Sequence, residues 1–224
     1  MTGSVDVGYS FSDYFGLSTG ISYGSFNGQV TLASYQNKFN TTDSENEAYE
    51  RQVSGTNIKE DQTIAFLGVP VWLNFGIPFT KRTGLSVRAG IEMAVPIKKN
   101  YHSGGIFTYK GYYPKYNVLL ENLPAYGFPT NAVIATDGVL ELNPFCIGAS
   151  VAAGIDFFIT RMIQSSIAVC YTQSLSGIQA YASPEKFQLS SDALRINSMM
   201  GGSSKATDRS TWLKISLRYY LSRH

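Results

Sequence analysis

The chain has 224 residues, charged residues make up 15% of it, and its formal net charge is +2. Its length suffices for one sizeable domain, its charge content lies well below the roughly 25% usual for soluble domains, and its near-neutral balance gives no reason to propose a nucleic-acid partner. No stretch approaches the ~18 consecutive apolar residues that a membrane-spanning helix needs.

The first two predicted strands lie near the N-terminus, at residues 4–11 and 15–24. Apolar residues alternate there with small or polar ones, which is the period of a strand with two different faces. A tight connection at residues 12–14 joins the two segments. Their apolar faces consist of Val5, Val7, Tyr9 and Phe11, and of Phe15, Leu17, Thr19, Ile21 and Tyr23.

The third and fourth predicted strands, residues 66–77 and 85–98, show the same contrast most clearly. A short turn at residues 80–83 separates them. Between the aliphatic residues stand glycine, serine, tryptophan and a few charged residues. The aliphatic faces consist of Leu67, Val69, Val71, Leu73, Phe75 and Ile77, and of Leu85, Val87, Ala89, Ile91, Met93, Val95 and Ile97.

Three further segments alternate in the second half of the chain: residues 145–157, 163–172 and 212–221. A short turn at residues 160–162 links the first two. In all of the segments, the face between the apolar residues is rich in Gly, Ser and Ala. The outer face of a soluble barrel would instead carry many Lys, Glu and Thr residues, so the pattern favours strands whose aliphatic face meets lipid.

The connections are of two kinds: three tight turns, and three long stretches at about residues 30–59, 101–141 and 177–210. Short periplasmic turns and long extracellular loops are typical of outer-membrane barrels, and aromatic residues beside the turns fit an interfacial girdle. We therefore expect one domain over residues 1–224: an all-β, transmembrane, antiparallel up-and-down β-barrel of about eight strands. It would lie in the outer membrane of a Gram-negative cell, in contact with lipids and lipopolysaccharide.

Seven alternating segments are one fewer than an even-stranded barrel requires. Because an open edge in lipid leaves backbone groups unpaired, we expect a further strand and an export signal upstream of Met1. The alternative is a strand hidden in a long connection, at residues 105–112 or 118–123.

Three segments resemble the small outer-membrane β-barrel proteins of the Bacteroidota: the proline-containing strand at residues 66–75, the strand end at 154–158 and the aromatic C-terminal strand at 217–221. The resemblance spans essentially the whole chain, and its motifs identify a fold rather than an activity. It implies an eight-stranded, OmpA-like or PorT-like barrel.

Charged residues on the small-residue face are the first candidate site. Side chains fill the interior of an eight-stranded barrel, and buried charges must be paired. We expect a structural network of salt bridges in the lumen; a proton or ion path is the alternative. The residues are Asp6, Arg88, Glu92, Asp156, Lys214 and Arg218.

Aromatic residues in the middle long connection are the second candidate site. A tyrosine-rich external loop stiffened by proline could dock another outer-membrane protein or a surface glycan. The alternatives are a lid packed over the barrel mouth or a continuation of the sheet. The residues are Tyr109, Tyr112, Tyr113, Tyr116, Tyr126 and Phe128.

No catalytic or metal-binding motif emerges from the sequence. The G-x-S-x-G sequence at residues 20–24 lies within a predicted strand and not at a strand-to-helix elbow, and the chain has no phosphate loop. The acidic first connection, with Asp43, Glu45, Glu47, Glu50, Glu60 and Asp61, lacks calcium-loop spacing and is expected to be a solvated loop. Cys146 and Cys170 are expected to be out of register, so a disulfide is not expected. These observations predict a non-enzymatic protein without a cofactor, either structural or a subunit of an outer-membrane assembly; the alternative is a small transport channel.

Overall fold

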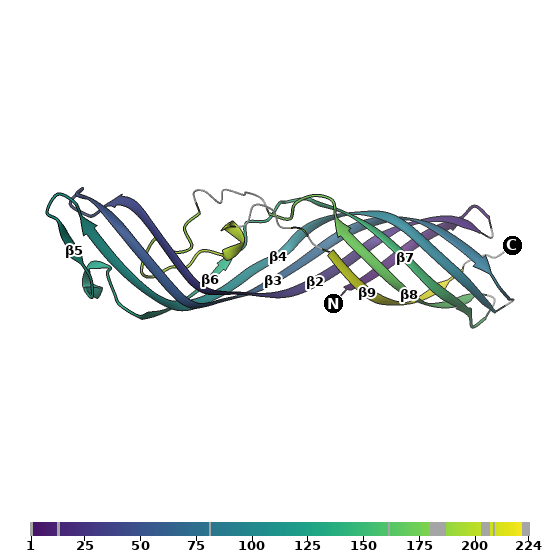
Figure 1. The fold of residues 1–224 in the computed structure, drawn as a ribbon. Coiled ribbons are helices and arrows are strands. Elements are labelled where there is room, and N and C mark those ends of the chain that lie inside the picture. Colours follow the sequence, from purple (N-terminus) through teal and green to yellow (C-terminus); the bar gives the residue numbers. More distant parts are fainter. Residues whose placement is uncertain are drawn as a thin grey trace.

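The computed structural model describes residues 2–12, 14–80, 82–160, 162–179, 187–202, 207 and 209–220 (Figure 1). The predicted turns and the last predicted strand include Asp13, Lys81, Arg161 and Leu221, which lie outside this part, as do residues 180–186, 203–206 and 208 of the third predicted long connection. Among the described residues, no helix is long and apolar enough to span a membrane. The strands are β1 (Thr2–Ser10), β2 (Phe15–Thr42), β3 (Ala48–Pro78), β4 (Thr83–Tyr113), β5 (Val118–Leu120), β6 (Ala132–Val139), β7 (Cys146–Phe158), β8 (Ile163–Ser174) and β9 (Arg209–Tyr219), with short 3-10 helices η1 (Pro124–Tyr126) and η3 (Met199–Gly202).

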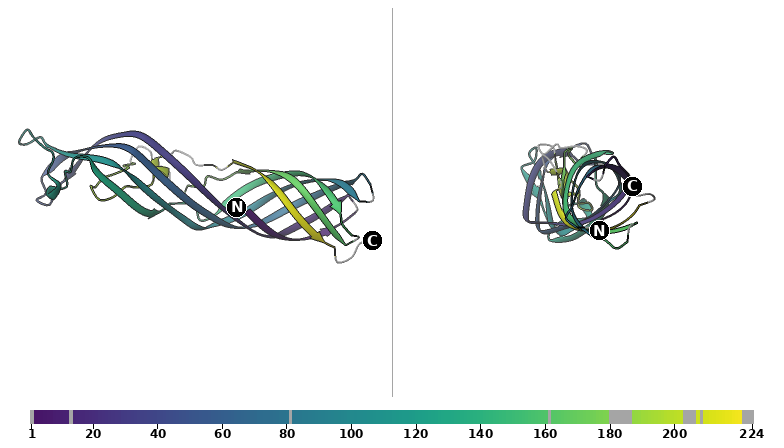
Figure 2. Two further views of the ribbon diagram at one scale, coloured as in Figure 1. Left: turned by 90° about the horizontal axis from the view of Figure 1, so that it is seen from below. Right: turned by 90° about the vertical axis from the view of Figure 1, so that its right-hand side faces the viewer.

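All nine strands belong to one antiparallel sheet. Its main path has the order β1-β2-β3-β4-β7-β8-β9, and β5 and β6 pair only with β4. The seven predicted segments correspond to the seven strands of this path, so the prediction of an all-β, antiparallel, up-and-down arrangement is confirmed. The sheet curls around an axis, as the end view in Figure 2 shows, but it is not closed: among the described residues, no pairing joins β1 to β9.

The prediction of three long loops is wrong for two of them, and the alternative that the middle connection continues the sheet is confirmed. Strand β2 continues to Thr42 and β3 begins at Ala48, so the first connection is mostly sheet with a turn at its end. The second connection contains the end of β4 together with β5 and β6. Of the segments proposed as hidden strands, residues 105–112 are the continuation of β4, and residues 118–123 include β5, which pairs with β4 off the main path; neither adds a strand to that path.

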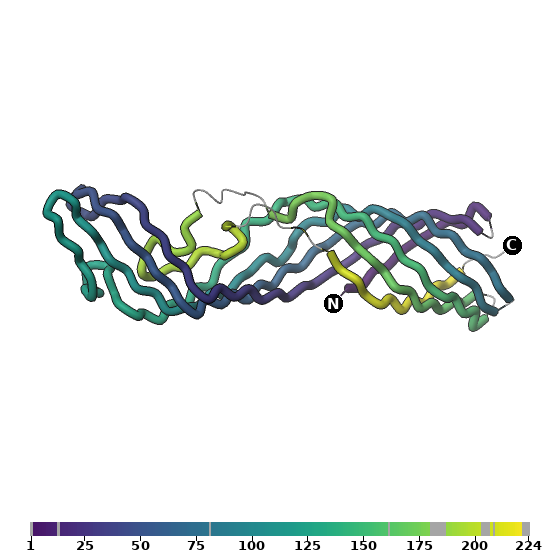
Figure 3. The backbone as a smooth tube through the Cα atoms, viewed as in Figure 1, coloured from purple at the N-terminus to yellow at the C-terminus, as the bar shows by residue number. Residues whose placement is uncertain are grey.

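The extended strands divide the molecule into two parts, which Figures 1 and 3 show at opposite ends. We call residues 2–24, 66–98, 146–174 and 209–219 the body, and residues 26–64 and 99–142 the arm. A third segment, residues 187–202, precedes β9 in the chain and lies against the concave side of the arm. We call it the strap.

The body and the arm have opposite polarity. In the body, aliphatic side chains such as Leu67 and Val69 are 42% and 47% exposed on the outside of the curl. In the arm, Val53 and Ile58 are 2% and 1% exposed on the inside, and the outward positions carry polar residues such as Lys59. One end of the sheet is therefore apolar outside, and the other end is apolar inside.

Two β-bulges accompany this change. The pairing of β3 with β4 shifts at two places. One shift lies between Thr56 and Lys59 of β3, where Asn57 has a φ of 53°. The other lies between Ala65 and Phe66 of β3, where Ile97 is the extra residue of β4. An extra residue moves every later side chain to the other face of a strand. Before Ile97 the odd-numbered residues of β4 point outward, and beyond it they point inward.

The strap completes the core of the arm. Leu189 and Ile196 of the strap are almost fully buried against aromatic and aliphatic side chains of β3, β4 and β6. A three- or four-stranded open sheet has an apolar face that must be covered, and the strap covers it. The buried cluster consists of Tyr49, Val53, Ile58, Phe107, Tyr109, Tyr113, Phe128, Ile134, Leu189 and Ile196.

The two environments predict different costs for the same substitution. Ile58→Ala is expected to destabilise the arm by about 2–4 kcal/mol, because it leaves a cavity in a packed core. Ile91→Ala in the body, where Ile91 is 52% exposed, is expected to cost less than about 1 kcal/mol in detergent. Hydrogen exchange of peptides from each part measures both effects, and equal losses would contradict the assignment of the arm core.

Candidate functional site

Charged residues on the inner face of the body form the first candidate site. The structure joins two of the six predicted residues directly: Lys214 Nζ of β9 lies 3.6 Å from Asp6 Oδ2 of β1. Both side chains are mostly buried, 16% and 19% exposed. This ion pair connects the two edge strands of the open sheet, so it bridges the seam that no backbone pairing closes.

The other acidic residues are satisfied by hydroxyl groups. Asp156 accepts a hydrogen bond from the Ser86 hydroxyl at 2.9 Å, and Glu92 accepts one from the Ser22 hydroxyl. Among the described residues, Asp6 and Lys214 form the one ion pair on this face. The six charges are therefore held at separate points rather than in one connected salt-bridge network.

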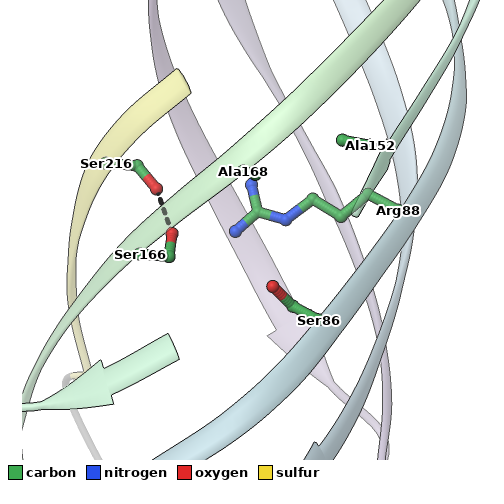
Figure 4. A pocket seen from close by; sticks show the side chains of 6 residues that line it. All are labelled: Ser86, Arg88, Ala152, Ser166, Ala168 and Ser216. Atoms are coloured by element: carbon green, nitrogen blue, oxygen red, sulfur yellow. Dashed lines mark hydrogen bonds between the residues drawn. The ribbon is translucent and has the colours of Figure 1, made fainter. Parts of the chain in front are cut away.

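Arg88 projects across the inside of the body into a small hollow, shown in Figure 4. The hollow has a volume of about 10 Å³, and its other lining residues are small. Space of this size holds about one water molecule. The lining residues are Ser86, Arg88, Ala152, Ser166, Ala168 and Ser216.

Small residues on the inner face leave room for the charged ones. A side chain at Gly68 would overlap the carboxylate of Glu92 and the hydroxyl of Ser22. Arg218 of β9 donates to the Tyr220 hydroxyl at 3.2 Å, near the turn end of the body. The Gly, Ser and Ala residues that alternate along the strands thus leave space inside the body for the charged side chains.

Three of the six aromatic residues proposed to bind a partner lie in the core of the arm instead. Tyr109, Phe128 and Tyr113 are 0%, 3% and 9% exposed. Tyr109 and Tyr113 occupy odd positions of β4, which the bulge at Ile97 directs inward. All three residues therefore belong to the buried core of the arm and not to an exposed loop.

Arg51 is a buried cation that the sequence analysis did not single out. Its guanidinium lies 5.1 Å from the ring centroid of Tyr109 and 5.5 Å from that of Phe128, and it donates to the carbonyl of Gly127 at 2.9 Å. Such contacts with ring faces stabilise a cation in an apolar setting. In the sequence, Arg51 stands at an odd-numbered position between Tyr49 and Val53, and this alternation places its side chain on the buried face of the arm.

The tip of the arm is held by stacked tyrosines and a carboxylate. The rings of Tyr113 and Tyr49 stack with centroids 5.1 Å apart, and the Tyr113 hydroxyl donates to Asp43 at 3.0 Å. Burial raises the pKa of Tyr113 to about 12, and the hydrogen bond to Asp43 adds to the shift. The hydrogen bond from the backbone N–H of Glu47 is the main cause that lowers the pKa of Asp43. The pair is therefore a neutral donor and a charged acceptor across the physiological range.

The remaining predicted aromatic residues are accessible. Tyr112 is half-buried and donates to Asn117, whereas Tyr116 and Tyr126 are 52% and 74% exposed. Beside Tyr116, Lys115 lies 2.9 Å from a carboxylate oxygen of Glu47. Of the three accessible tyrosines, Tyr116 borders a shallow hollow of about 340 Å³, which is lined by Asn46, Glu47, Ala48, Tyr113, Lys115 and Tyr116.

The strap is tied to the arm by a buried carboxylate. Glu60 is 0% exposed and accepts hydrogen bonds from the Ser198 hydroxyl and the Met199 backbone N–H, both at 2.7 Å. The Tyr109 hydroxyl lies 2.6 Å from that of Ser190. The expectation that Glu60 belongs to a solvated acidic loop is wrong, because it faces the strap from the middle of β3.

Other reactive groups form no site in the described part of the chain. No group of three or more His, Cys, Asp or Glu residues is placed there to hold a metal ion. Cys146 and Cys170 are buried and free, as their register predicted, and they face Ala94 and Trp212 on neighbouring strands.

Comparisons of the chain with protein families, with curated proteins and with solved structures find no match. Two features of the molecule bear on its function: the opposite polarity of the outward faces of the body and the arm, and the buried core of the arm beneath the strap.

We expect Asp6 and Lys214, which form the ion pair across the seam, to show a large coupling energy in the free energy of unfolding. In a double-mutant cycle with Asp6→Asn and Lys214→Met, we expect a coupling energy of about 1–3 kcal/mol, because both groups are largely removed from water. The exposed pair Lys38–Glu50 on the arm, 3.8 Å apart, is the control, with an expected coupling below about 0.5 kcal/mol. Urea unfolding monitored by tryptophan fluorescence measures both cycles, and equal coupling would contradict the shielding of the seam pair.

The strap is expected to detach when Glu60 is removed. Glu60→Ala leaves the Ser198 hydroxyl and the Met199 N–H without their acceptor, at a cost of about 1–3 kcal/mol. Proteolytic cleavage within residues 187–202 should become roughly 5- to 150-fold faster, because cleavage follows the open population. The neighbouring variant Asp61→Ala, on the outward face, serves as the control and should leave the rate unchanged.

Proposed function

We propose that the protein is a non-enzymatic outer-membrane β-barrel protein whose arm stands outside the membrane and docks another macromolecule of the envelope. In this role it is structural or a subunit of an outer-membrane assembly. The observation that carries the proposal is the opposite polarity of the body and the arm.

The outer face of the body supports contact with lipid. Soluble monomers rarely expose contiguous apolar patches larger than a few hundred Å². Here, outward aliphatic residues follow one another along β3, β4, β7, β8 and β9, with exposed fractions between 37% and 73%. The outward run from Leu67 to Ile77 has the length of about 9–11 residues that a tilted transmembrane strand needs.

Aromatic residues at the turn end of the body support an interfacial position for that end. The rings of Phe11, Phe15 and Phe75 form a continuous series, with successive centroids 5.4 Å and 5.2 Å apart. Tyr14 and Phe79 are exposed nearby, 61% and 64%. Rings of this kind gather where a barrel meets the headgroups.

The arm has the construction of a domain that stands in water. Its apolar side chains are buried beneath the strap and its outward face is polar. It is also stiff, because β2, β3 and β4 cross from the body into the arm without a break. A stiff projection on a membrane anchor suits a docking role, and the exposed Tyr116 and Tyr126 lie at its far end.

The sequence resemblance agrees with this assignment. The motifs at residues 66–75 and 154–158 lie in β3 and β7 of the body, where small outer-membrane barrels of the Bacteroidota, OmpA-like or PorT-like, carry such strands. Seven alternating strands leave the edges β1 and β9 running in the same direction. One strand antiparallel to both would complete a barrel of eight.

A small transport channel is the alternative function, and the interior of the body supports it less. The inner face carries Trp72, which is 7% exposed, and the hollow at Arg88 has a volume of about 10 Å³. A conducting path would require water along the whole axis.

Reconstitution into lipid vesicles tests the membrane assignment. Ile91→Arg places a charge in the middle of the outward apolar band, which costs about 2–4 kcal/mol at the centre of a bilayer. The control is Asn100→Arg, on the exposed face of the same strand in the arm. Insertion is measured as the heat-modifiable band on a gel and as protection from protease.

We expect Ile91→Arg to lose insertion and Asn100→Arg to keep it. Equal insertion of the two variants, or a monomer that stays soluble without detergent, would overturn the membrane assignment. In planar bilayers the inserted protein should show no steady conductance; a steady open pore would favour the channel.

A further inference from the structure

The end of the arm farthest from the body carries a shallow hollow between two turns of the chain. The turn that joins β2 to β3 forms one side of it, and the turn between β4 and β5 forms the other; Figure 1 shows both turns at this end of the arm. The hollow has a volume of about 340 Å³, within the range of about 300–1,000 Å³ that is usual for ligand sites. Its lining residues are Asn46, Glu47, Ala48, Tyr113, Lys115 and Tyr116.

Hydrogen bonds hold the two turns in shape and join them to each other. The backbone N–H of Glu47 donates to Asp43 at 3.0 Å within the first turn, and the Tyr113 hydroxyl donates to Asp43 at 3.0 Å from the end of β4. Asn46 and Asn117 have φ values of 62° and 53°, in the left-handed region that asparagine adopts more readily than most residues. A site that is shaped in advance loses little conformational freedom when a ligand binds.

The hollow presents a charged acceptor and a charged donor side by side. Glu47 Oε1 accepts a hydrogen bond from Lys115 Nζ at 2.9 Å and another from the Tyr116 hydroxyl. These two bonds, the one from Tyr116 first, lower the pKa of Glu47, so its carboxylate is charged at neutral pH. Within the described part of the chain both donors use this one oxygen, and Oε2 stays available to a ligand.

Tyr116 adds an accessible aromatic ring to these polar groups. Lys115 Nζ lies 4.9 Å from the centroid of this ring, yet Tyr116 is still 52% exposed. A tyrosine ring offers flat apolar area at a low cost in conformational entropy. The C–H groups of a pyranose ring pack on such a surface, while the hydroxyl groups at its rim need donors and acceptors close by. The hollow combines both requirements.

The charges around the hollow disfavour acidic ligands. Residues 43–47 and 113–117 contain three acidic residues and one basic residue: Asp43, Glu45, Glu47 and Lys115. Phosphate, carboxylate and sulfate groups are therefore repelled. Asp43 and Glu47 already accept hydrogen bonds from Tyr113 and Lys115, so they suit hydroxyl groups better than a bare metal ion. The class that remains is a neutral ligand rich in hydroxyl groups.

We propose that the hollow at the tip of the arm binds a neutral saccharide of the cell envelope, carried by lipopolysaccharide or by a surface glycoprotein. This inference rests on the proposed function, because it names the chemistry of the macromolecule that the arm docks. One pyranose ring packs against Tyr116, and its hydroxyl groups donate to Glu47 Oε2 and accept from Lys115 Nζ. Because the hollow is shallow, one saccharide should bind with a Kd of about 1 mM, and a polysaccharide gains affinity by occupying the arms of several copies.

The test applies the full chain, refolded in a detergent without a sugar headgroup, to an array of oligosaccharides. The array holds neutral chains of hexoses, deoxyhexoses and N-acetylhexosamines, each beside a counterpart that carries sialic acid, a uronate or a sulfate. We expect the protein to retain at least one neutral chain, and to bind its acidic counterpart at least about fivefold more weakly. Saturation-transfer NMR with the retained chain measures the Kd and identifies the sugar protons in contact.

Two exposed tyrosines of the arm provide matched variants. Tyr116→Ala removes the ring beside the hollow and should weaken binding about tenfold or more, whereas Tyr126→Ala removes a ring that does not line the hollow and should leave binding unchanged. Glu47→Gln keeps the shape of the acceptor without its charge and should weaken binding about three- to tenfold, because hydrogen bonds to charged groups are the stronger ones. Hydrogen exchange of the arm-core peptide around Phe107 shows that each variant is folded.

Competition identifies the macromolecule that carries the saccharide. Polysaccharide released from lipopolysaccharide and glycans released from surface glycoproteins are added separately, and inhibition by either one names the source. Inhibition by neither would overturn the assignment to an envelope saccharide.

Three further results would overturn the proposal. They are retention of no neutral chain, stronger binding of the acidic counterparts, and equal loss of binding in Tyr116→Ala and Tyr126→Ala. The heat-modifiable band tests the body separately, so failure of the membrane assignment is recognised independently.

Discussion

The alternation of side chains across a pleated strand is the constraint on which the whole structure depends. Because successive residues face opposite sides, the residue chosen at every second position decides which side of the sheet is apolar. In the body the aliphatic residues face outward, and in the arm they face inward. The same three strands serve both parts, so the change requires an extra residue in a strand. Asn57 in β3 and Ile97 in β4 supply it.

The body and the arm also bury their charged residues in different ways. In the body, small residues make room for Asp6, Lys214 and Arg88, and serine hydroxyls satisfy the other carboxylates. In the arm, Arg51 is held between aromatic rings and Glu60 by the strap. The ion pair of Asp6 and Lys214 thereby joins the two edge strands, and Glu60 joins the strap to the arm. The charges specify how the parts meet, and the apolar contacts supply most of the stabilisation.

Much of the body could be read from the sequence, and the arm could not. The seven segments were recognised because their aliphatic face is continuous, and their turns are short. Residues 48–64 and 99–113 also form strands, but polar and charged residues stand on both of their faces, including Arg51 and Glu60 on the buried one, so no continuous aliphatic face marks them in the sequence. Tyr109 and Tyr113 are buried because the bulge at Ile97 directs them inward, and a bulge is recognised only once both strands are paired. Phe128 lies outside the strands, between η1 and β6, and is buried against Tyr49 and Arg51.

The sequence by itself determined the strand class, the antiparallel order and the face that each strand of the body turns outward, because these properties are local and repeat every two residues. Only the tertiary structure decided that the sheet extends into an arm, that Glu60 meets Ser198, 138 residues further along the chain, and that the seam between β1 and β9 stays open. Contacts of this kind depend on the register of neighbouring strands and on the packing of distant segments. No local pattern of residues encodes either.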